Sequence, residues 1–282
     1  DTHPRVLTGY QTTIHGVAIQ KDNKILITGQ FHNPNSTLHY GYVMRIDENG
    51  QFDTSFGPMA DGLVLLANPS TGPFLPEELK VTDSGNIYVV TINSLHKLNS
   101  IGLYDTSFNG IGRIGTFNLS GVLYSTGQIA IDHEENAYVL TNRGPGPSVF
   151  AVDRCLIVKY LPNGSKDMLF GINGEVLLIP PTGEGYSCSD IALASEGGLV
   201  VSGISYDLTN NNPKTHIFRL TANGGMESTF GNGGITAVVA PQIPNPIYVW
   251  GWDNVFVTTD SENNIRFAAS EYFVTNPGMQ YV

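Results

Sequence analysis

The feature that most constrains the fold is a short phrase that recurs four times along the chain. Its copies are RIDENGQFDTSFG at 45–57, KLNSIGLYDTSFN at 97–109, KYLPNGSKDMLFG at 159–171 and RLTANGGMESTFG at 219–231. Each copy starts with a basic residue, has a Gly five residues later and a Phe six residues after that Gly. These glycines are separated by 52, 62 and 60 residues: Gly50, Gly102, Gly164 and Gly224. A repeat with a period of tens of residues decides the whole architecture.

A second phrase precedes each copy of the first. It reads GVAIQKDNKILITGQ at 16–30, LKVTDSGNIYVVT at 79–91, IAIDHEENAYVLT at 129–141 and IALASEGGLVVSG at 191–203. A fifth copy, VFVTTDSENNIRFAAS at 255–270, has no copy of the first phrase after it. On either side of a polar turn, apolar residues alternate with polar or small ones, which predicts two half-buried antiparallel strands in each unit.

Two further strands complete each unit. Asn49-Gly50, Asn163-Gly164 and Asn223-Gly224 supply the positive-φ pair that a tight hairpin turn needs. A third strand is expected before this turn, and a fourth beyond the Phe, at 62–67, 174–180 and 233–239. Four antiparallel strands per unit of about 56 residues predict the blade of a β-propeller. The predicted units are 11–67, 75–118, 125–180, 187–240 and, together, 251–282 and 1–10.

The two phrases together resemble the delta-60 repeat, a β-propeller repeat common in secreted and surface proteins of bacteria. GVAIQKDNKILITGQ and RIDENGQFDTSFG carry the resemblance, which extends over nearly the whole chain in five copies. The second copy departs from it with Asn109 in place of Gly, and the fourth with Glu227 in place of Asp. The resemblance implies a propeller and no common activity, because the family is largely uncharacterised.

The chain ends predict how the ring closes. MQYV at 279–282 looks like a third strand, and RVLTGY at 5–10 looks like a fourth strand that precedes the first unit. We therefore expect one all-β domain over 1–282, a five-bladed β-propeller whose terminal blade is completed by both chain ends. Such closure removes the exposed sheet edges that favour aggregation. The alternative is a fragment of a larger propeller; the sequence starts at Asp1, which suggests a processed or trimmed chain.

Composition excludes several partner classes. There are 14 Lys and Arg against 25 Asp and Glu, giving a formal net charge of −11. Such a chain repels a phosphate backbone, so nucleic acid is not an expected partner. No run approaches the roughly 18 to 20 apolar residues of a membrane-spanning helix. The sequence contains no phosphate-binding loop, and we expect no cofactor. Nothing in it indicates an oligomeric state.

One end of the predicted blades is more elaborate than the other. The connections between first and second strands, and between third and fourth strands, are short; we call this side the short-turn end. The opposite loop end carries long segments at 31–40, 142–154, 204–215, 241–254 and 271–278. Loops on a rigid scaffold usually carry binding, so ligand contacts are expected there. The candidate ligand-binding residues are Tyr248, Trp250, Trp252, His32, Tyr40, Tyr206 and Tyr272. Alternatively, Trp250 and Trp252 fill space between blades.

Catalytic and metal-binding motifs are weak. No G-x-S-x-G elbow occurs, although Asp132 and Asp190 lie at first strands, where carboxylates 5 to 9 Å apart would serve glycoside cleavage. The run from Asp47 to Asp53 superficially resembles a calcium loop, but the other copies lack its pattern; a hairpin and an Asx-type bond explain it better. The seven histidines lack metal-site spacing. Catalytic residues therefore stay unknown, and no metal is expected.

The two cysteines carry information about the compartment. Cys155 and Cys188 lie at the loop end of adjacent predicted blades. A disulfide between them would close a loop of about 33 residues and contribute ~3 kcal/mol. The alternative is two independent thiols. A disulfide would indicate an extracellular, cell-surface or periplasmic location.

These observations favour a non-enzymatic binding or scaffold module that presents its loop end to a protein or glycan. The uniform repeats, the single elaborate end and the absence of a catalytic motif support this hypothesis. A carbohydrate-active hydrolase or lyase using carboxylates of the central channel is one alternative. A structural unit of a larger surface assembly is another. The contents of the channel discriminate between binding and catalysis.

Overall fold

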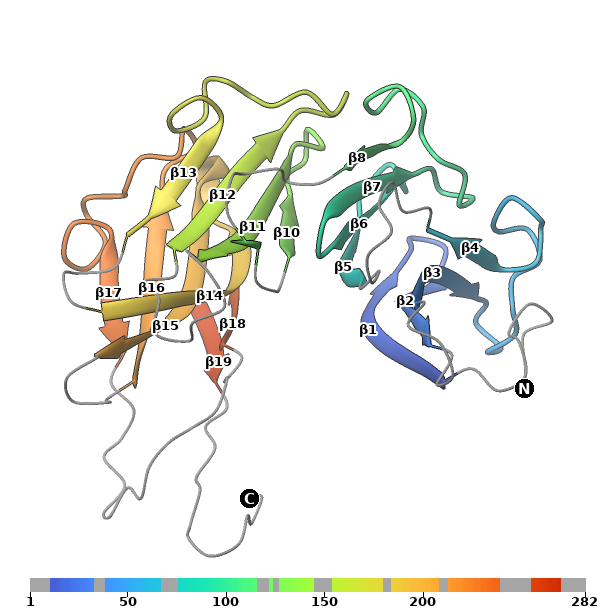
Figure 1. Cartoon of the computed structure of the whole chain (residues 1–282), viewed down its shortest axis with the longest axis horizontal. Helices are drawn as coiled ribbons and strands as arrows, with labels where there is room; N and C mark the ends of the chain where they lie inside the picture. The colour runs from blue at the N-terminus through green and yellow to red at the C-terminus, as the bar shows by residue number, and fades with distance from the viewer. Residues whose placement is uncertain are drawn as a thin grey trace, which may run out of the picture. The chain divides into compact units, whose positions relative to one another are not determined.

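The structure is a computed structural model that describes residues 11–32, 39–66, 76–115, 122–123, 127–144, 154–179, 184–207, 213–238 and 255–269. Apart from one turn of 3₁₀ helix at Ser195–Gly197, every regular element in these ranges is a β-strand (Figure 1). The strands pair in antiparallel sheets. The predicted all-β class is therefore confirmed for the residues that the structure describes.

In the described residues, five sheets follow one another along the chain. The first contains β1 (Gln11–Ile19), β2 (Ile25–His32), β3 (His39–Ile46) and β4 (Leu63–Leu65). The second contains β5 (Pro76–Val81), β6 (Ile87–Thr91), β7 (Ser94–Leu98) and β8 (Arg113–Gly115). The third contains β10 (Gln128–Ile131), β11 (Ala137–Gly144), β12 (Arg154–Tyr160) and β13 (Glu175–Leu178), and β9 (Val122–Leu123) pairs with β11.

The fourth sheet contains β14 (Glu184–Leu193), β15 (Leu199–Asp207), β16 (Pro213–Leu220) and β17 (Ile235–Val238). The fifth, as far as the structure describes it, contains β18 (Val255–Thr259) and β19 (Ile265–Ala269). In the first four sheets the four main strands pair in chain order, so the predicted four-stranded antiparallel unit is confirmed there.

The chain divides into two compact units, each described by itself. One contains Asp1–Ser120, Ser125–Val139 and Lys159–Asp167, and the other contains Gly121–Tyr124, Leu140–Val158 and Met168–Val282. In the first unit β5 lies between β1 and β10, and in the second β14 lies beside β18, so first strands of successive sheets are neighbours. The number of blades, the closure and the single domain stay predictions, because 1–10 and 270–282 lie outside the described residues.

The recurrent phrase forms a corner between the third and fourth strands. In the first copy, Arg45 Nε donates to Asp53 Oδ2 at 2.9 Å, and the guanidinium lies 4.5 Å from the centroid of the Phe56 ring. The same ion pair recurs in the next two copies, from Lys97 to Asp105 at 3.2 Å and from Lys159 to Asp167 at 2.9 Å. Because a buried cation without a partner is costly, the basic residue and the acid of the phrase depend on each other.

Hydrogen bonds within the corner keep its acid ionised. Asp53 Oδ1 accepts from the backbone N of Ser55 at 2.9 Å and from its Oγ at 2.6 Å, which is the Asx-type bond expected from the sequence. Burial alone raises the pKa of the Asp53 carboxyl. The hydrogen bonds from Ser55 and Lys24 and the charge of Arg45 outweigh burial and hold that pKa well below its usual range.

Each of these corners is tied to the hairpin turn of the following copy. The backbone N–H groups after the three phenylalanines donate to that turn: Gly57 to Ile101 O at 2.9 Å, Asn109 to Asn163 O at 2.8 Å and Gly171 to Asn223 O at 2.8 Å. Gly102 has a φ of +83°, and a Cβ at this position would lie 2.7 Å from the Phe56 ring. The recurring Gly and Phe are thus two sides of one joint between neighbouring sheets.

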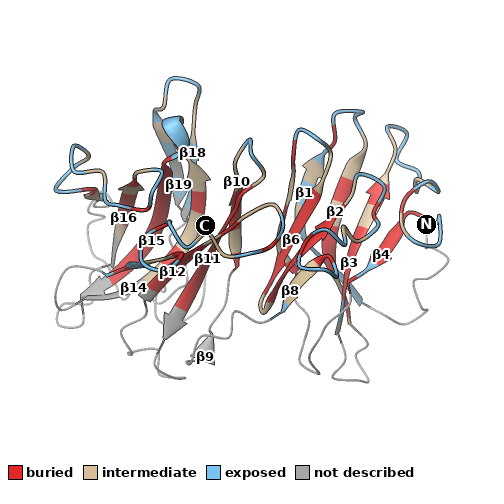
Figure 2. Ribbon diagram, turned by 90° about the horizontal axis from the view of Figure 1, so that it is seen from above, coloured by how far each residue is buried: buried red, intermediate tan, exposed pale blue. Residues whose placement is uncertain are grey.

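A buried cluster fills the space between the first and second sheets. Its members are Leu26, Val43, Phe56, Val64, Leu66, Leu79, Ile87, Val89 and Leu98. Figure 2 shows these strands buried along their length, with exposed turns at one end. The other face of the first sheet is different, since Ile14, Val17 and Ile19 are 65, 65 and 66% exposed. Leu79, which occupies in β5 the position of Val17 in β1, is buried.

Candidate functional site

The first strands of three sheets carry a bulge at the same position of the repeat. The register shifts between Ile14 and Gly16 in β1, between Pro76 and Glu78 in β5, and between Cys188 and Asp190 in β14. The extra residues are His15, Glu77 and Ser189. Bulges redirect a side chain and are common beside active sites. Sequence reasoning did not find these residues, because a bulge leaves no clear mark in an apolar-polar alternation.

Two of the bulge residues have shifted pKa values. His15 and Glu77 lie in the first unit, on the neighbouring strands β1 and β5. Burial lowers the pKa of His15, whose Nε2 lies 3.1 Å from Thr13 Oγ1. Burial raises the pKa of Glu77. Both shifts favour the neutral form of the side chain, and a carboxyl with a raised pKa is suited to donating a proton.

The acids next to two of the bulges hold neighbouring strands together. Glu78 Oε2 accepts from the backbone N of Ile129 at 2.8 Å, which joins β5 to β10. Asp190 Oδ2 accepts in the same way from Val257 N at 2.9 Å, which joins β14 to β18, and its Oδ1 accepts from Ile191 N. Asp190 was one of the two acids considered for catalysis, and the structure gives its carboxylate a structural role.

Asp132 also acts within a turn. Its Oδ1 accepts from the backbone N of Glu134 at 3.0 Å and of Asn136 at 2.8 Å. Its Oδ2 accepts from Asn136 Nδ2 at 2.8 Å and from the Tyr138 hydroxyl at 3.1 Å. Four hydrogen bonds on one carboxylate stabilise the turn between β10 and β11. Asp132 and Asp190 belong to different units, and nothing in the geometry of either supports a catalytic pair.

The loop end of the first sheet brings polar and aromatic side chains together. His32 and His39 face each other across β2 and β3, with ring centroids 4.5 Å apart and planes 18° from parallel. His39 Nδ1 lies 2.9 Å from Gln30 Oε1. Tyr40 is 41% exposed, while its cross-strand neighbour Phe31 is buried and stacks on Tyr42. At this end of the sheet the imidazole and amide groups therefore lie on one face and the phenol of Tyr40 lies on the other.

The other predicted ligand residues cannot be placed beside these. Tyr248, Trp250, Trp252 and Tyr272 lie outside the described residues. Tyr206 belongs to β15, where its backbone pairs with Gly185 and Pro213. Their role in ligand binding stays a prediction. Of the seven residues, His32 and Tyr40 are those whose side chains the structure describes, and it places them at the same end of the first sheet.

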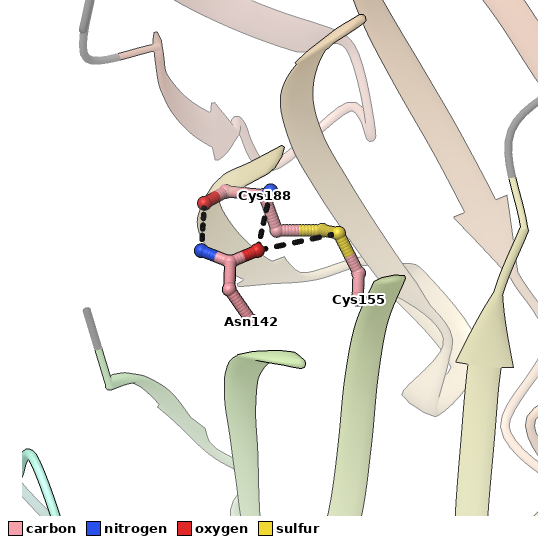
Figure 3. The surroundings of a disulfide bond; sticks show 3 residues. All are labelled: Asn142, Cys155 and Cys188. Carbon is pink, nitrogen blue, oxygen red and sulfur yellow. Dashed lines mark hydrogen bonds between the residues drawn. A yellow bond between two sulfur atoms is a disulfide. The ribbon is translucent and has the colours of Figure 1, made fainter. Parts of the chain in front are cut away.

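A disulfide lies at the loop end of β12 and β14. Cys155 and Cys188 are joined, with their Cα atoms 5.7 Å apart, and both side chains are buried. Figure 3 shows Asn142 beside them. Asn142 Nδ2 donates to Cys188 O at 2.9 Å, and its Oδ1 accepts from Cys188 N at 2.7 Å. The amide of Asn142 therefore holds the backbone of Cys188 as a neighbouring strand would.

Two serine–histidine pairs resemble nucleophile–base pairs but are buried. Ser94 Oγ lies 2.8 Å from His96 Nε2, and Ser205 Oγ lies 2.7 Å from His216 Nε2. All four side chains are buried. Burial, reinforced by the charge of Arg113, lowers the pKa of His96 to about 3, so this imidazole is neutral at physiological pH. A substrate cannot reach these groups in the described structure, and they act as core hydrogen bonds.

Within the described ranges, no group of three or more His, Cys, Asp or Glu residues could hold a metal ion. In the calcium-like run, Asp47 Oδ1 accepts from the backbone N atoms of Asn49 and Gln51, both at 2.9 Å, as a hairpin turn requires. The expectation that the protein needs no cofactor is untested. Among the described residues, no helix is long and apolar enough to cross a membrane.

Comparison with known proteins agrees with this architecture. Residues 20–56 match the model of a family described as "Domain of unknown function (DUF5122) beta-propeller". This match runs from the first hairpin turn to Phe56 of the first corner. No curated protein matches the sequence.

Two solved structures have similar folds. One is an alpha-L-arabinanase of Penicillium chrysogenum complexed with arabinobiose, with 8% identity, a TM-score of 0.51 and coverage of 91% of this chain and 74% of that one. The other is an ulvan lyase of family PL25 bound to -[GlcA(1-4)Rha3S]-, with 11% identity, a TM-score of 0.51 and coverage of 94% and 68%. At such identities the likeness concerns the fold alone. The four-stranded antiparallel sheets, the family match and these neighbours define the protein as a β-propeller.

Proposed function

We propose that the protein is a non-enzymatic β-propeller module that binds a glycan at its loop end. The observation that carries this proposal is the end of the first sheet, where His32, His39 and Gln30 lie together on one face and the exposed ring of Tyr40 lies on the other. An aromatic ring packs against the C–H face of a sugar, and imidazole and amide groups hydrogen-bond sugar hydroxyls, so the two faces would contact different units of one glycan. The arabinanase and ulvan lyase structures, which contain bound saccharides, support a glycan over a protein ligand.

The hydrogen bonds made by the acids at the first strands support binding without catalysis. Glu78 and Asp190 accept hydrogen bonds from the backbone of the next sheet, and Asp132 is held by its own turn. Glycoside cleavage needs two carboxylates available to substrate. Acids that are already bonded to the scaffold do not meet this need.

A glycan array on the wild type and on three variants tests the proposal. Replacing both His39 and Tyr40 by Ala removes a hydrogen-bonding group and a stacking ring, and we expect at least a ~10-fold loss of affinity for any bound glycan. His133→Ala is the matched control, because His133 is an exposed histidine at the short-turn end. A Trp250→Ala, Trp252→Ala variant separately tests the aromatic residues outside the described ranges. Binding that is unchanged in the His39, Tyr40 variant contradicts the proposal.

The second candidate function is a carbohydrate-active hydrolase or lyase. His15 and Glu77 favour it, because they are titratable bulge residues on neighbouring first strands and both have shifted pKa values. The test is depolymerisation of arabinan, ulvan and related polysaccharides, followed as new reducing ends or unsaturated products. Activity that disappears in both Glu77→Gln and His15→Ala would establish this alternative. A wild-type protein without activity on any polysaccharide would leave binding as the function.

We also propose that the five repeats are of the delta-60 type and form a five-bladed ring whose last blade is completed by both chain ends. The exposed apolar face of β1 supports closure, because Leu79 at the position equivalent to Val17 is buried against a preceding sheet. A fragment of a larger propeller, or a structural unit of a larger surface assembly, would need a partner sheet on that face. Small-angle scattering that fits a closed ring for a monomer would support the proposal over these alternatives.

An extracellular, cell-surface or periplasmic location is likewise proposed. The Cys155–Cys188 disulfide supports it, since such bonds persist in oxidising compartments and are rare in the cytosol.

A further inference from the structure

The loop end of the first sheet has one polar face. The register of the strands places on this face the side chains of Gln11 and Thr13 of β1, Gln30 and His32 of β2 and His39 of β3. His15 lies beside them, since its Nε2 is 3.1 Å from Thr13 Oγ1. We call these residues the polar face. It contains three of the 7 histidines of the chain and no aspartate or glutamate.

The second sheet stops short of the polar face. Further along the same face of the first sheet, Leu26 and Val43 pack against the second sheet. In the repeat, Thr91 at the end of β6 corresponds to Gly29, so β2 runs on beyond the level at which β6 ends. The polar-face residues of β2 and β3 lie beyond that level and are partly exposed, and those of β1 are exposed. All of them belong to the first unit.

Two histidines of the polar face form a stacked pair. The ring centroids of His32 and His39 are 4.5 Å apart, and the ring planes are 18° from parallel. His39 Nδ1 lies 2.9 Å from Gln30 Oε1. Because an amide oxygen only accepts, His39 Nδ1 donates in this contact, and Nε2 is the nitrogen at which the ring gains its charge. Two protonated rings side by side repel each other unless an anion neutralises them.

The acids on the neighbouring strands do not supply that anion. Apart from the pair, the titratable side chains on the first sheet and on β5 and β7 of the second sheet are His15 on β1, Tyr40, Tyr42 and Arg45 on β3, Glu77, Glu78 and Lys80 on β5, and His96 and Lys97 on β7. Glu78 is bonded to the backbone N of Ile129 and paired with Lys80. Burial raises the pKa of Glu77 and so favours its uncharged form. Protonation therefore gives the polar face a positive charge that no acid of its own balances.

We propose that the polar face binds an acidic unit of the glycan, with His32 and His39 holding its carboxylate or sulfate in their protonated form. This ligand class rests on the glycan binding proposed above and makes it more specific. A hydrogen bond from a protonated imidazole to an oxyanion is roughly twice as strong as one between neutral groups, which favours acidic over neutral sugars. Because imidazoles change charge between about pH 5 and pH 8, the affinity for an acidic glycan rises as the pH falls.

Matched pairs of labelled oligosaccharides test the proposal, with binding followed by fluorescence anisotropy in the presence of EDTA. One pair is a sulfated oligosaccharide and its desulfated form, and the other is an oligogalacturonate and its methyl ester. From about pH 7.5 to about pH 5.5 the protonated fraction of a free imidazole rises about 10-fold. We expect the affinity for the acidic member of at least one pair to rise by about the same factor, while the affinity for its neutral member stays constant. The pair that responds identifies the anion.

Four variants locate the charge. The double variant His32→Gln, His39→Gln keeps hydrogen-bonding groups but cannot be charged, and its affinity for the acidic sugar should be the same at both pH values. His39→Lys carries a charge at both and should bind the acidic sugar more tightly than the wild type at the higher pH. Glu77→Gln should keep the pH response of the wild type. So should His133→Gln, the matched control, because His133 is an exposed histidine at the short-turn end.

The failure of this proposal can be distinguished from failure of the proposed function. Equal binding of acidic and neutral members at both pH values would leave glycan binding intact and overturn the acidic ligand. A pH response that survives in the double Gln variant, or disappears in Glu77→Gln, would overturn it as well, because the charge would then reside elsewhere. If neither pair binds but the array identifies a neutral glycan, the acidic ligand is wrong. If no glycan binds at all, the proposed function itself fails.

Discussion

The side-chain contacts at the two ends of the strands differ in how far they recur from sheet to sheet. At the short-turn end, one arrangement recurs: a buried cation, an acid that accepts from it, a buried Phe and a backbone bond to the next turn. At the loop end, the first four sheets differ more from one another. The first has the His32–His39 stack, the second and fourth each have a buried serine–histidine pair, and the third and fourth share Asn142 and the disulfide. The recurring contacts at the short-turn end are those that the fold needs. The varying contacts at the loop end are those that can differ with function.

The comparison also explains why the third corner is notable. It keeps the ion pair from Lys159 to Asp167 and the buried Phe170, which are the parts that the fold needs. At the two positions between the acid and this Phe it has Met168 and Leu169, which are both exposed. These two positions therefore differ from the other copies without changing the parts that hold the corner together.

The largest effect is expected from Phe56→Ala. Phe56 is fully buried, contacts Arg45 and fits against Gly102 of the next copy. Loss of its ring leaves a cavity at the joint of two sheets, and the free energy of unfolding should fall by about 3–5 kcal/mol. Urea denaturation measures this. Tyr40→Ala, which removes a partly exposed ring at the loop end, should cost less than about 1 kcal/mol; equal losses would show that the joint is not special.

The next largest contribution to the free energy of unfolding is expected from the disulfide at the loop end. The double variant Cys155→Ser, Cys188→Ser opens a loop with a sequence separation of 33 and should lose ~3 kcal/mol in the free energy of unfolding. The wild type in reductant should approach the stability of this variant once reduced. The variant itself should not respond to reductant, and a response would point to another cause.

A smaller loss, about 1–3 kcal/mol at neutral pH, is expected for Asp53→Asn, which leaves Arg45 without its anionic partner. The pKa of Asp53 is depressed in the folded state. Its contribution is therefore fully present above the unfolded pKa near ~3.9 and is lost as pH falls below that value towards the folded pKa. Thermal unfolding from about pH 5 to pH 2 should show a shallower acid loss in the variant than in the wild type. Parallel profiles would contradict the role of this ion pair.

The smallest effect is expected from Met168→Thr with Leu169→Ser, which gives the third corner the residues of the first two. Because both side chains are exposed, the free energy of unfolding should change by no more than about 0.5 kcal/mol. Urea denaturation checks this. A loss above about 2 kcal/mol would mean that these residues stabilise the fold despite their exposure.

Much of the fold could be predicted because the repeat carries it. The strands β1, β2 and β3 lie where the alternation of Val17, Ile19 and their successors predicts them, and β4, β13 and β17 begin just past the Phe of each corner. The Asx-type bond of Asp53 was also foreseen. The ion pair to Arg45 was not, although both residues stood in the recurring phrase, because a sequence does not show which polar side chains meet after the chain turns.

The candidate site was predicted less well. His32 and Tyr40 were selected for their place in a long loop, but only the register of β2 and β3 shows that His32 lies with His39 and Gln30 on one face and Tyr40 on the other. His15 and Glu77 were missed because only backbone pairing reveals a bulge.

The sequence by itself determined the four-stranded unit and its corner, since both depend on residues that are close along the chain and recur with it. The tertiary structure decided what each acid does and which apolar side chains stay exposed. Glu78 and Asp190 find their partners at Ile129 and Val257, tens of residues away on the next sheet. Whether a carboxylate is structural or available, and whether Leu169 is core or surface, depends on neighbours that only the packing of sheets provides.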